Sequence, residues 1–573
     1  MADIDLVIRN GIVVDGSGGA MQDADIAISG GRIAAIGKSL PRGKEEVDAR
    51  GQLVTPGFVD IHTHYDGQVT WENRLAPSSA HGVTTAVMGN CGIGFAPCRP
   101  QDRADLIRLM EGVEDLPEVV LSAGLPWAWE SFPDYLDFVG SRQFDTDVCA
   151  QLPHAALRVF AMGRRAIDRE QATADDRATM ARLAKEAVEA GAIGFGTSRT
   201  INHRASDGTL VYTLDAAEEE LAAIGEALGA AGKGVLQVVS DFDDPERELG
   251  MLRRVVERAG RPLSVSLGQI HATPDRWREV LDWIEGCNAD GLEVRAQVSG
   301  RPVGMLLGYE LSYHPFSYTP TWKSLLGLPV EQRLVALRDA AIRAAITSET
   351  PDAGDFIGAD FIRQFQLMYP LGAPVNYEFA PGSNVASRAA KLGLTPAEHA
   401  YDLMLEEGGR AVLMLPTTNF GGESLAAAEA MLRHPNTVYG LGDGGAHLGF
   451  LCDASLPTYM LQHWARDRTA GAKLPLEQVI AGLSARPAAA VGLHDRGLIR
   501  PGYRADINII DFDRLALHSP RIAYDLPEGG KRLTQAAEGY RATILNGVTV
   551  QRDGTPTGAL PGRLVRGAQR AAA

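Results

Sequence analysis

Two histidines separated by one residue end a short apolar segment near the start of the chain. The segment reads Val54-Thr55-Pro56-Gly57-Phe58-Val59-Asp60-Ile61-His62-Thr63-His64. Because side chains alternate along a β-strand, His62 and His64 point to the same side. Their Cα atoms then lie about 6.6 Å apart, at about 3.3 Å per residue, and both imidazoles can reach one ion. The spacing predicts a divalent metal site at the carboxyl end of a strand.

A thiol and a carboxylate elsewhere in the chain are the next candidate ligands. Cys91 lies in Gly89-Asn90-Cys91-Gly92-Ile93-Gly94, and Asp443 lies in Gly442-Asp443-Gly444-Gly445-Ala446-His447 after an apolar strand. Imidazole, thiolate and carboxylate together suit zinc. We expect His62, His64, Cys91 and Asp443 to be ligands of zinc or a similar divalent ion. A second ion is left open.

Strands and helices alternate through the middle of the chain. Apolar positions at helical spacing predict helices at 175–190, 215–231, 245–259 and 274–285, each followed by a short apolar strand. Repeated βα units imply a parallel sheet, most simply a (β/α)8 barrel. The eight predicted strands are 58–62, 84–88, 157–161, 192–196, 235–239, 263–267, 292–298 and 437–441.

The two ends of the chain carry short strands and turns. Leu6–Arg9 and Ile12–Val14 flank Asn10-Gly11, which predicts a hairpin, and two strand-rich stretches follow residue 504. We predict a small β-sandwich domain built from both termini, residues 1–56 and 490–573. A metal-dependent barrel domain spans 57–489. A helical insertion or lid, 300–410, interrupts it.

Further polar side chains follow the predicted strand ends, where barrel enzymes carry their reactive groups. The candidates for binding metal or substrate are Arg199, His203, Gln237, Gln269, His271, Arg301 and His447. The apolar run Met305–Tyr309 fits either a pocket wall or the core of the insertion.

Composition excludes several classes of partner. A formal net charge of −17 argues against nucleic acid and anionic membranes. We find no apolar run long enough to span a bilayer. Five scattered cysteines suit a reducing, cytoplasmic compartment. We expect a small-molecule partner, and a homo-oligomer is left open.

Three motifs together resemble the amidohydrolase superfamily, and within it the N-acyl-D-amino-acid deacylases. They are the His62-Thr63-His64 strand end, the Gly89–Gly92 loop after His81-Gly82-Val83-Thr84-Thr85, and the Gly442–His447 turn. The resemblance implies a hydrolase that cleaves a non-peptide carbon–nitrogen bond by metal-activated water. It also implies that Asp443 carries the proton from that water to the leaving nitrogen.

The chain departs from the family pattern at two strands. The family has histidines after strands five and six, where this chain reads Leu236-Gln237-Val238 and Ser264-Val265-Ser266-Leu267-Gly268-Gln269. Gln269 also stands where the family has a lysine that helps to hold a substrate carboxylate. One ion is therefore favoured over two, with Gln237, His271 or water as an added ligand.

Other groups must then bind the substrate, and Arg199, His203 and Arg301 are the candidates. Two alternatives to the deacylase prediction stay open. One is a hydrolase of cyclic or other small amides on the same scaffold. The other is a non-catalytic, self-associating protein that has kept the fold and lost the metal.

Overall fold

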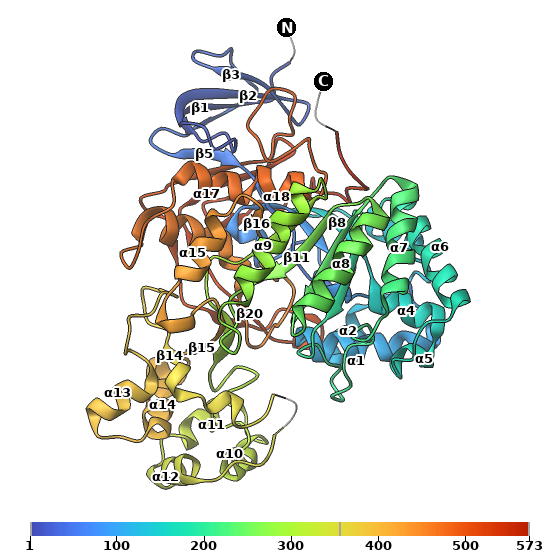
Figure 1. Cartoon of the computed structure of the whole chain (residues 1–573). Coiled ribbons are helices and arrows are strands. Elements are labelled where there is room, and N and C mark those ends of the chain that lie inside the picture. Colours follow the sequence, from blue (N-terminus) through green and yellow to red (C-terminus); the bar gives the residue numbers. More distant parts are fainter. Residues whose placement is uncertain (1–2, 355–356, 571–573) are drawn as a thin grey trace.

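The computed structural model describes residues 3–354 and 357–570, and eight parallel strands form its central sheet (Figure 1). Their order is β16-β12-β11-β10-β9-β8-β7-β6. The strands are β6 (Phe58–Asp60), β7 (Val83–Met88), β8 (Asp147–Pro153), β9 (Gly194–Arg199), β10 (Val235–Ser240), β11 (Leu263–Leu267), β12 (Val294–Val298) and β16 (Thr437–Tyr439).

The first and last strands of this sheet meet just beyond their carboxyl ends. Thr63 and Gly444 form a parallel bridge. His64 N donates to Gly444 O at 2.7 Å, and Asp443 N donates to His62 O at 3.0 Å. These contacts curl the sheet into a barrel, which confirms the predicted fold class.

Four outer helices agree with the periodicity of the sequence. They are α6 (Ala174–Ala190), α7 (Glu218–Ala231), α8 (Pro245–Ala259) and α9 (Arg276–Ala289). The Thr173 side chain caps α6 in a reciprocal pair with Asp176, and Gly191 ends it with a φ of 118°. Figure 1 shows α6, α7 and α8 on one flank of the barrel.

The third strand was predicted wrongly. Residues 157–161 lie in helix α4 (His154–Met162), and the strand is β8 instead. Ala and Leu dominate the first part of α4, and both favour helices. β8 begins with Asp147 and contains Gln151, which are buried and bonded to Arg496 and Asn90 respectively. A search for apolar runs missed this strand because it contains polar residues with buried partners.

The N-terminal hairpin prediction is also wrong. Leu6–Val13 is one continuous strand, β1, with an irregularity between Ile8 and Gly11. Asn10 has a φ of 58°, and its backbone N–H donates to Asp25 Oδ1 at 2.9 Å. A Cβ on Gly11 would lie 2.4 Å from Val54 Cγ2. The Asn-Gly pair therefore forms a bulge within one strand and not a turn between two strands.

Both chain ends contribute to one nine-stranded sheet, at the top of Figure 1. The N-terminal strands are β1 (Leu6–Val13), β2 (Gln22–Ser29), β3 (Arg32–Gly37), β4 (Glu45–Asp48) and β5 (Leu53–Pro56). The C-terminal strands are β17 (Ile507–Ile510), β22 (Tyr540–Leu545), β23 (Val548–Arg552) and β24 (Thr555–Pro556). β5 pairs with β17, which joins the two halves. The exact domain boundaries given above stay predictions.

The insertion between β12 and β16 forms a separate helical body, drawn in yellow in Figure 1. Its helices are α10 (Pro320–Leu325), α11 (Val330–Ala336), α12 (Ala340–Ser348), α13 (Val385–Leu392) and α14 (Pro396–Leu405). A small sheet of β13 (Val303–Leu307), β15 (Leu413–Thr418) and β14 (Tyr369–Pro370) connects it to the barrel. Met305, Leu307 and Tyr309 are buried in the insertion's own core, so the core interpretation of this run is confirmed.

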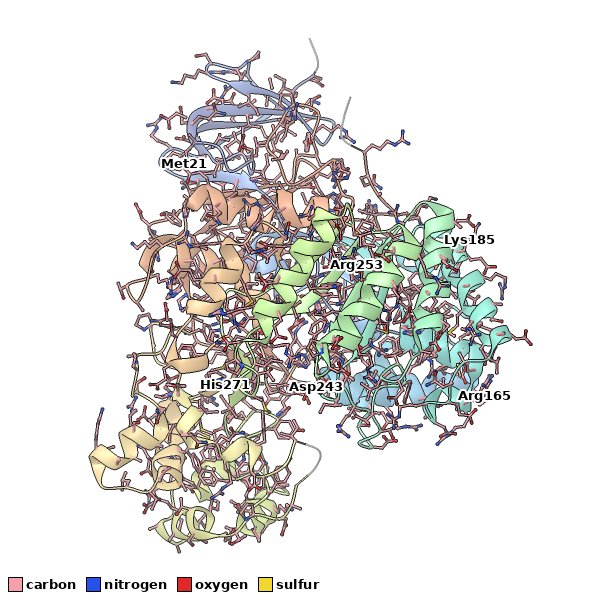
Figure 2. The ribbon with its side chains drawn as sticks, viewed as in Figure 1. Met21, Arg165, Lys185, Asp243, Arg253 and His271 are labelled. Atoms are coloured by element: carbon pink, nitrogen blue, oxygen red, sulfur yellow. The ribbon has the colours of Figure 1, made fainter. Side chains whose placement is uncertain are left out.

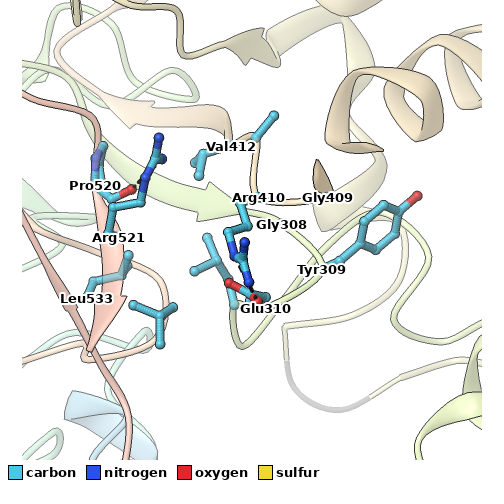
Figure 3. Close-up of a pocket in the computed structure, with 12 residues that line it drawn as sticks. Gly308, Tyr309, Glu310, Gly409, Arg410, Val412, Pro520, Arg521 and Leu533 are labelled. Atoms are coloured by element: carbon cyan, nitrogen blue, oxygen red, sulfur yellow. Dashed lines mark hydrogen bonds and ion pairs between the residues drawn. The ribbon is translucent and has the colours of Figure 1, made fainter. Parts of the chain in front are cut away.

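A small cavity lies where the insertion meets the C-terminal segment. Pro520, Arg521 and Leu533 line it from one side, and Gly308 and Arg410 from the other (Figure 3). Its volume of about 20 Å³ has room for one water molecule. None of the candidate site residues lines it.

Three helices occupy the long connection between β7 and β8, namely α1 (Arg103–Glu114), α2 (Glu118–Gly124) and α3 (Phe132–Gly140). Among the helices of residues 3–354 and 357–570, none combines the length and apolar character that crossing a bilayer requires.

Candidate metal centre

Four predicted ligands converge at the carboxyl end of the barrel. His62 Nε2 lies 3.3 Å from Cys91 Sγ and 3.5 Å from Asp443 Oδ1. His64 Nε2 lies 3.6 Å from the same Asp443 oxygen. Donor atoms of His62, His64 and Cys91 all lie within 4.8 Å of one another. Tetrahedral ligands at zinc distances of about 2.0–2.3 Å are separated by roughly 3.3–3.8 Å, and the three contacts of 3.3–3.6 Å lie in this range, although Asp443 is outside the group of side chains whose donors all lie within 4.8 Å.

The backbone around these donors is tightly constrained. Cys91 has a φ of 55°, and its N–H donates to Gln237 Oε1 at 2.8 Å. A Cβ on Gly89 would lie 2.3 Å from Gln151 O, so only glycine fits before this loop. Asp443 has a φ of 45°. The loops after β7 and β16 are therefore held in conformations that bring the thiol and the carboxylate to the imidazoles.

The outer ring nitrogens of both histidines lie against acceptors. His62 Nδ1 is 2.6 Å from Gln297 Oε1, and His64 Nδ1 is 3.1 Å from Glu114 Oε1. The Gln297 bond favours a proton on His62 Nδ1 and leaves its Nε2 lone pair free for a cation, whereas Glu114 meets His64 Nδ1 at ion-pair distance without forming a hydrogen bond. The Nε2 atoms of both histidines lie close to Asp443 Oδ1, and that of His62 also lies close to Cys91 Sγ.

Charges around the centre support the same assignment. Burial lowers the pKa of His62 to about 4. Burial alone would raise the pKa of Asp443, but the hydrogen bond with His64 and the charge of His62 lower it instead. Burial raises the pKa of the Cys91 thiol to about 11. A bound cation is the group that would hold this thiol as a thiolate.

Two further histidines flank the centre. His203 Nδ1 lies 2.9 Å from Ser198 Oγ. Burial, together with the charges of His447 and His64, lowers the pKa of His203 to about 3. His447 Nε2 lies 3.5 Å from Glu114 Oε2. Both predicted residues are therefore within electrostatic reach of the ligands.

The two predicted arginines are engaged in internal pairs. Arg199 binds the Glu248 carboxylate and donates to Ala216 O at 2.8 Å. Arg301 is 1% exposed, pairs with Asp453 and donates to Ser455 Oγ at 2.9 Å. Neither guanidinium is free to hold a substrate carboxylate in this arrangement.

Gln269 and His271 lie outside the group of metal donors. Gln269 Oε1 accepts a bond from Gly421 N at 3.0 Å. His271 lies in the loop between β11 and α9, at the lower edge of the barrel in Figure 2. Burial alone lowers the pKa of His271, in contrast to His203.

Sequence reasoning missed Glu114, Gln297 and Asp60. Gln297 is a polar residue in the middle of the apolar strand β12, a pattern that marks it for the barrel interior. Asp60 precedes His62 by two residues, and its Oδ1 accepts the His62 N–H at 3.1 Å. Glu114 ends a helix of the β7–β8 connection, and no local pattern connects it with His64.

Comparison with known proteins identifies the family. A model described as "Amidohydrolase family" matches residues 45–551. The chain belongs to the amidohydrolase family. The N-acyl-D-aspartate deacylase of Alcaligenes xylosoxydans xylosoxydans is 28% identical over 98% of this chain and 95% of that protein. The D-aminoacylase of the same organism is 28% identical over 98% and 97%.

Solved structures share the fold. A D-aminoacylase superposes with a TM-score of 0.66 at 23% identity, covering 98% of this chain and 100% of the other. An N-acyl-D-glutamate deacylase from Bordetella bronchiseptica, complexed with zinc and a phosphonate inhibitor, gives 0.65 at 22% identity with the same coverage. The predicted superfamily is therefore confirmed. So is the predicted class, a hydrolase of carbon–nitrogen bonds other than peptide bonds, because the relatives are named deacylases and an aminoacylase.

Metal dependence agrees with these neighbours, one of which is described as having a binuclear metal centre. In this chain, strand five contributes Gln237 and strand six contributes Ser266, whose Oγ is 3.5 Å from Gln237 Nε2. Within residues 3–354 and 357–570, His62, His64 and Cys91 form the one group of three metal-binding side chains close enough to share an ion.

Proposed function

We propose that this protein is a deacylase that hydrolyses the amide bond of an N-acyl amino acid, of the D configuration, with one zinc ion. His62, His64, Cys91 and Asp443 are the proposed ligands. One observation supports the proposal: His62 Nε2 lies 3.3 Å from Cys91 Sγ and 3.5 Å from Asp443 Oδ1, and His64 Nε2 lies 3.6 Å from the same oxygen, so donors from three separate loops meet at one place.

A single ion is favoured because the family's second set of ligands is absent. Gln237 uses its side-chain oxygen to hold the Cys91 N–H at 2.8 Å, and Ser266 lies beside its amide nitrogen. A neutral amide and a hydroxyl are weak ligands for zinc in comparison with imidazole and thiolate. His271 does not join the cluster of donors.

The chemistry follows from the groups around this point. A bound divalent ion supplies Lewis acidity, which polarises an amide carbonyl and makes a water molecule more acidic. Asp443 is ionised, because the neighbouring imidazoles lower its pKa. Its carboxylate accepts the proton of the attacking water and returns it to the leaving nitrogen. His203 is neutral, since burial lowers its pKa to about 3, and offers an uncharged hydrogen-bonding group to the substrate.

The name of the relatives suggests the substrate class. Proteins 27–28% identical over nearly the whole chain are named for N-acyl-D-aspartate, N-acyl-D-glutamate and D-amino acids. Arg199 and Arg301 are paired with Glu248 and Asp453, so the substrate carboxylate must be bound by other groups. The insertion's apolar run is a core, and gives no support for an apolar acyl pocket.

The test combines metal analysis with a substrate screen. We expect about one zinc per chain, and cleavage of at least one N-acyl-D-amino acid in preference to its L form and to neutral aryl amides. His62→Asn should lose both metal and activity, whereas the control His434→Gln, at a histidine that pairs with Glu285 on the outside, should keep both. A chain without metal, or one that cleaves only neutral amides, would overturn the proposal.

We further propose a cytoplasmic location and small-molecule partners. All five cysteines are free and buried, which suits a reducing compartment. The net charge of −17 disfavours nucleic acid. A homo-oligomer stays a prediction to be tested by light scattering.

A further inference from the structure

One buried carboxylate lies between two histidines that are far apart in the sequence, one after the first barrel strand and one after the last. Glu114, the last residue of α1, is 1% exposed. Its Oε1 is 3.1 Å from His64 Nδ1, and its Oε2 is 3.5 Å from His447 Nε2. We propose that Glu114 is a positioning residue, which fixes His64 as an Nε2 ligand and holds His447 beside the metal centre. This inference rests on the proposed function.

The partners of Glu114 differ from those of three other buried carboxylates. Burying an ionised carboxylate is costly unless a cation pairs with it. Asp147, Glu378 and Glu220 each pair with a buried arginine. In the part of the chain that the structure describes, the ion pairs of Glu114 are with His64 and His447 alone. Those three carboxylates each have a permanent cation, whereas the cationic partners of Glu114 are histidines at the proposed metal centre.

The two imidazole ligands have different outer partners. His62 Nδ1 meets the neutral amide of Gln297 at 2.6 Å, whereas His64 Nδ1 meets the Glu114 carboxylate. A carboxylate behind a ligand histidine fixes its orientation and tautomer and makes its other nitrogen a stronger donor. Glu114 therefore strengthens His64 as a ligand in a way that Gln297 does not strengthen His62.

His447 completes the arrangement. It has a φ of 50°, and its ring packs against Phe450 at 5.2 Å between centroids. Its Nε2 lies 3.5 Å from Glu114 Oε2, and its other ring nitrogen, Nδ1, is buried without a hydrogen-bond partner within the described residues. In the proposed arrangement Glu114 takes the proton of His447 Nε2, and the unpartnered Nδ1 can then accept the N–H of an amide substrate.

The neighbouring residue supplies a matched control. Asp115 accepts bonds from Ser312 Oγ and Gly449 N, each at 2.8 Å. It therefore anchors the insertion and the loop after β16, and makes no contact with a proposed ligand. Asp115→Asn tests whether loosening this helix end is enough to disturb the metal centre.

The experiment measures zinc affinity by competition with a chelator, together with the melting temperature of the metal-free protein. We expect Glu114→Gln to weaken zinc binding by roughly 10- to 100-fold without lowering the melting temperature of the metal-free protein. Asp115→Asn should keep zinc affinity within about twofold of the unchanged chain. Unchanged zinc affinity in Glu114→Gln, or an equal loss in both variants, would overturn the proposal.

A second measurement addresses His447. Glu114→Gln and His447→Gln should each lower kcat, with little change in KM, and the double variant should lose little more than either single one. Additive losses would contradict coupling through His447. If the unchanged protein binds zinc but cleaves none of the screened amides, the proposed function fails, and the zinc comparison still decides the role of Glu114.

Discussion

Replacing Glu378 by glutamine is expected to loosen the attachment of the insertion, and to do so in a pH-dependent way. Glu378 Oε2 accepts bonds from His463 at 2.8 Å and from Arg468 at 2.9 Å, and its Oε1 accepts a second bond from Arg468 at 3.0 Å. His463 lies in the π-helical segment Met460–Asp467, and Arg468 follows it. These bonds join the insertion to the outer layer of the barrel.

The size of the effect follows from the pKa of Glu378. Burial alone would raise this pKa, but the bonds from His463 and Arg468 lower it from 4.5 to about 2. At about 1.36 kcal/mol per pKa unit, the ionised form contributes about 3 kcal/mol to the closed state. A lowered carboxyl pKa stabilises above the unfolded value, so this contribution is full above pH 4.5 and is lost as the pH falls through about 2.

Amide hydrogen exchange, followed by mass spectrometry, reports local opening in residues 371–382 and Met460–Asp467. Protection in the unchanged chain should exceed that in Glu378→Gln by roughly 300-fold at pH 7, and by roughly 30-fold at pH 3.5. The control Glu331→Gln removes an exposed carboxylate that pairs with Arg410, and should leave protection unchanged. A ratio between Glu378→Gln and the unchanged chain that is the same at both pH values would refute the linkage argument.

Three further predictions concern the centre itself. Asp443→Asn should lower turnover by roughly 10²- to 10⁴-fold while zinc stays bound. Steady-state kinetics measures the turnover, and elemental analysis measures the zinc. Turnover at the normal rate would show that Asp443 is not the proton carrier. Gln237→Leu leaves the buried Cys91 N–H without its acceptor, at a cost of about 1–3 kcal/mol. Chelator competition should then detect weaker zinc binding. Unchanged zinc affinity would mean that the Gln237 amide does not position the loop. Arg199→Lys loses the two-pronged contact with Glu248, and should lower the melting temperature with KM unchanged; a large rise in KM would instead make Arg199 a substrate anchor.

Local sequence patterns were enough to place the four proposed ligands at one end of the barrel. The strand period placed His62 and His64 on one side, and the barrel rule placed Cys91 and Asp443 at the same end. Apolar periodicity likewise predicted α8, because Leu249, Leu252, Val255 and Val256 all face the core. Patterns of this kind carry over to the structure because each depends on neighbours along the chain.

What the sequence did not reveal depends on partners far away in the chain. The first residue of the buried strand β8, Asp147, is paired with Arg496, which lies 349 residues later. Glu114 is remote from His447 in sequence, and nothing in its helix distinguishes it from a solvent-exposed glutamate. Arg199 and Arg301 were predicted as substrate anchors since an arginine after a strand resembles one. In the structure Arg199 pairs with the buried Glu248, and Arg301 pairs with the buried Asp453.

The closure of the barrel and the assembly of the metal centre involve the same backbone segments. His62 O accepts the Asp443 N–H, and His64 N donates to Gly444 O, so the bonds that join the first and last strands also fix three of the four proposed ligands. Gly442 makes this approach feasible, because a Cβ there would lie 2.1 Å from Asp60 Oδ2. An ion that binds all three ligands acts on the folded, closed form alone and therefore stabilises it by mass action. The fold preorganises the proposed centre, and an ion bound there would in turn stabilise the closed barrel.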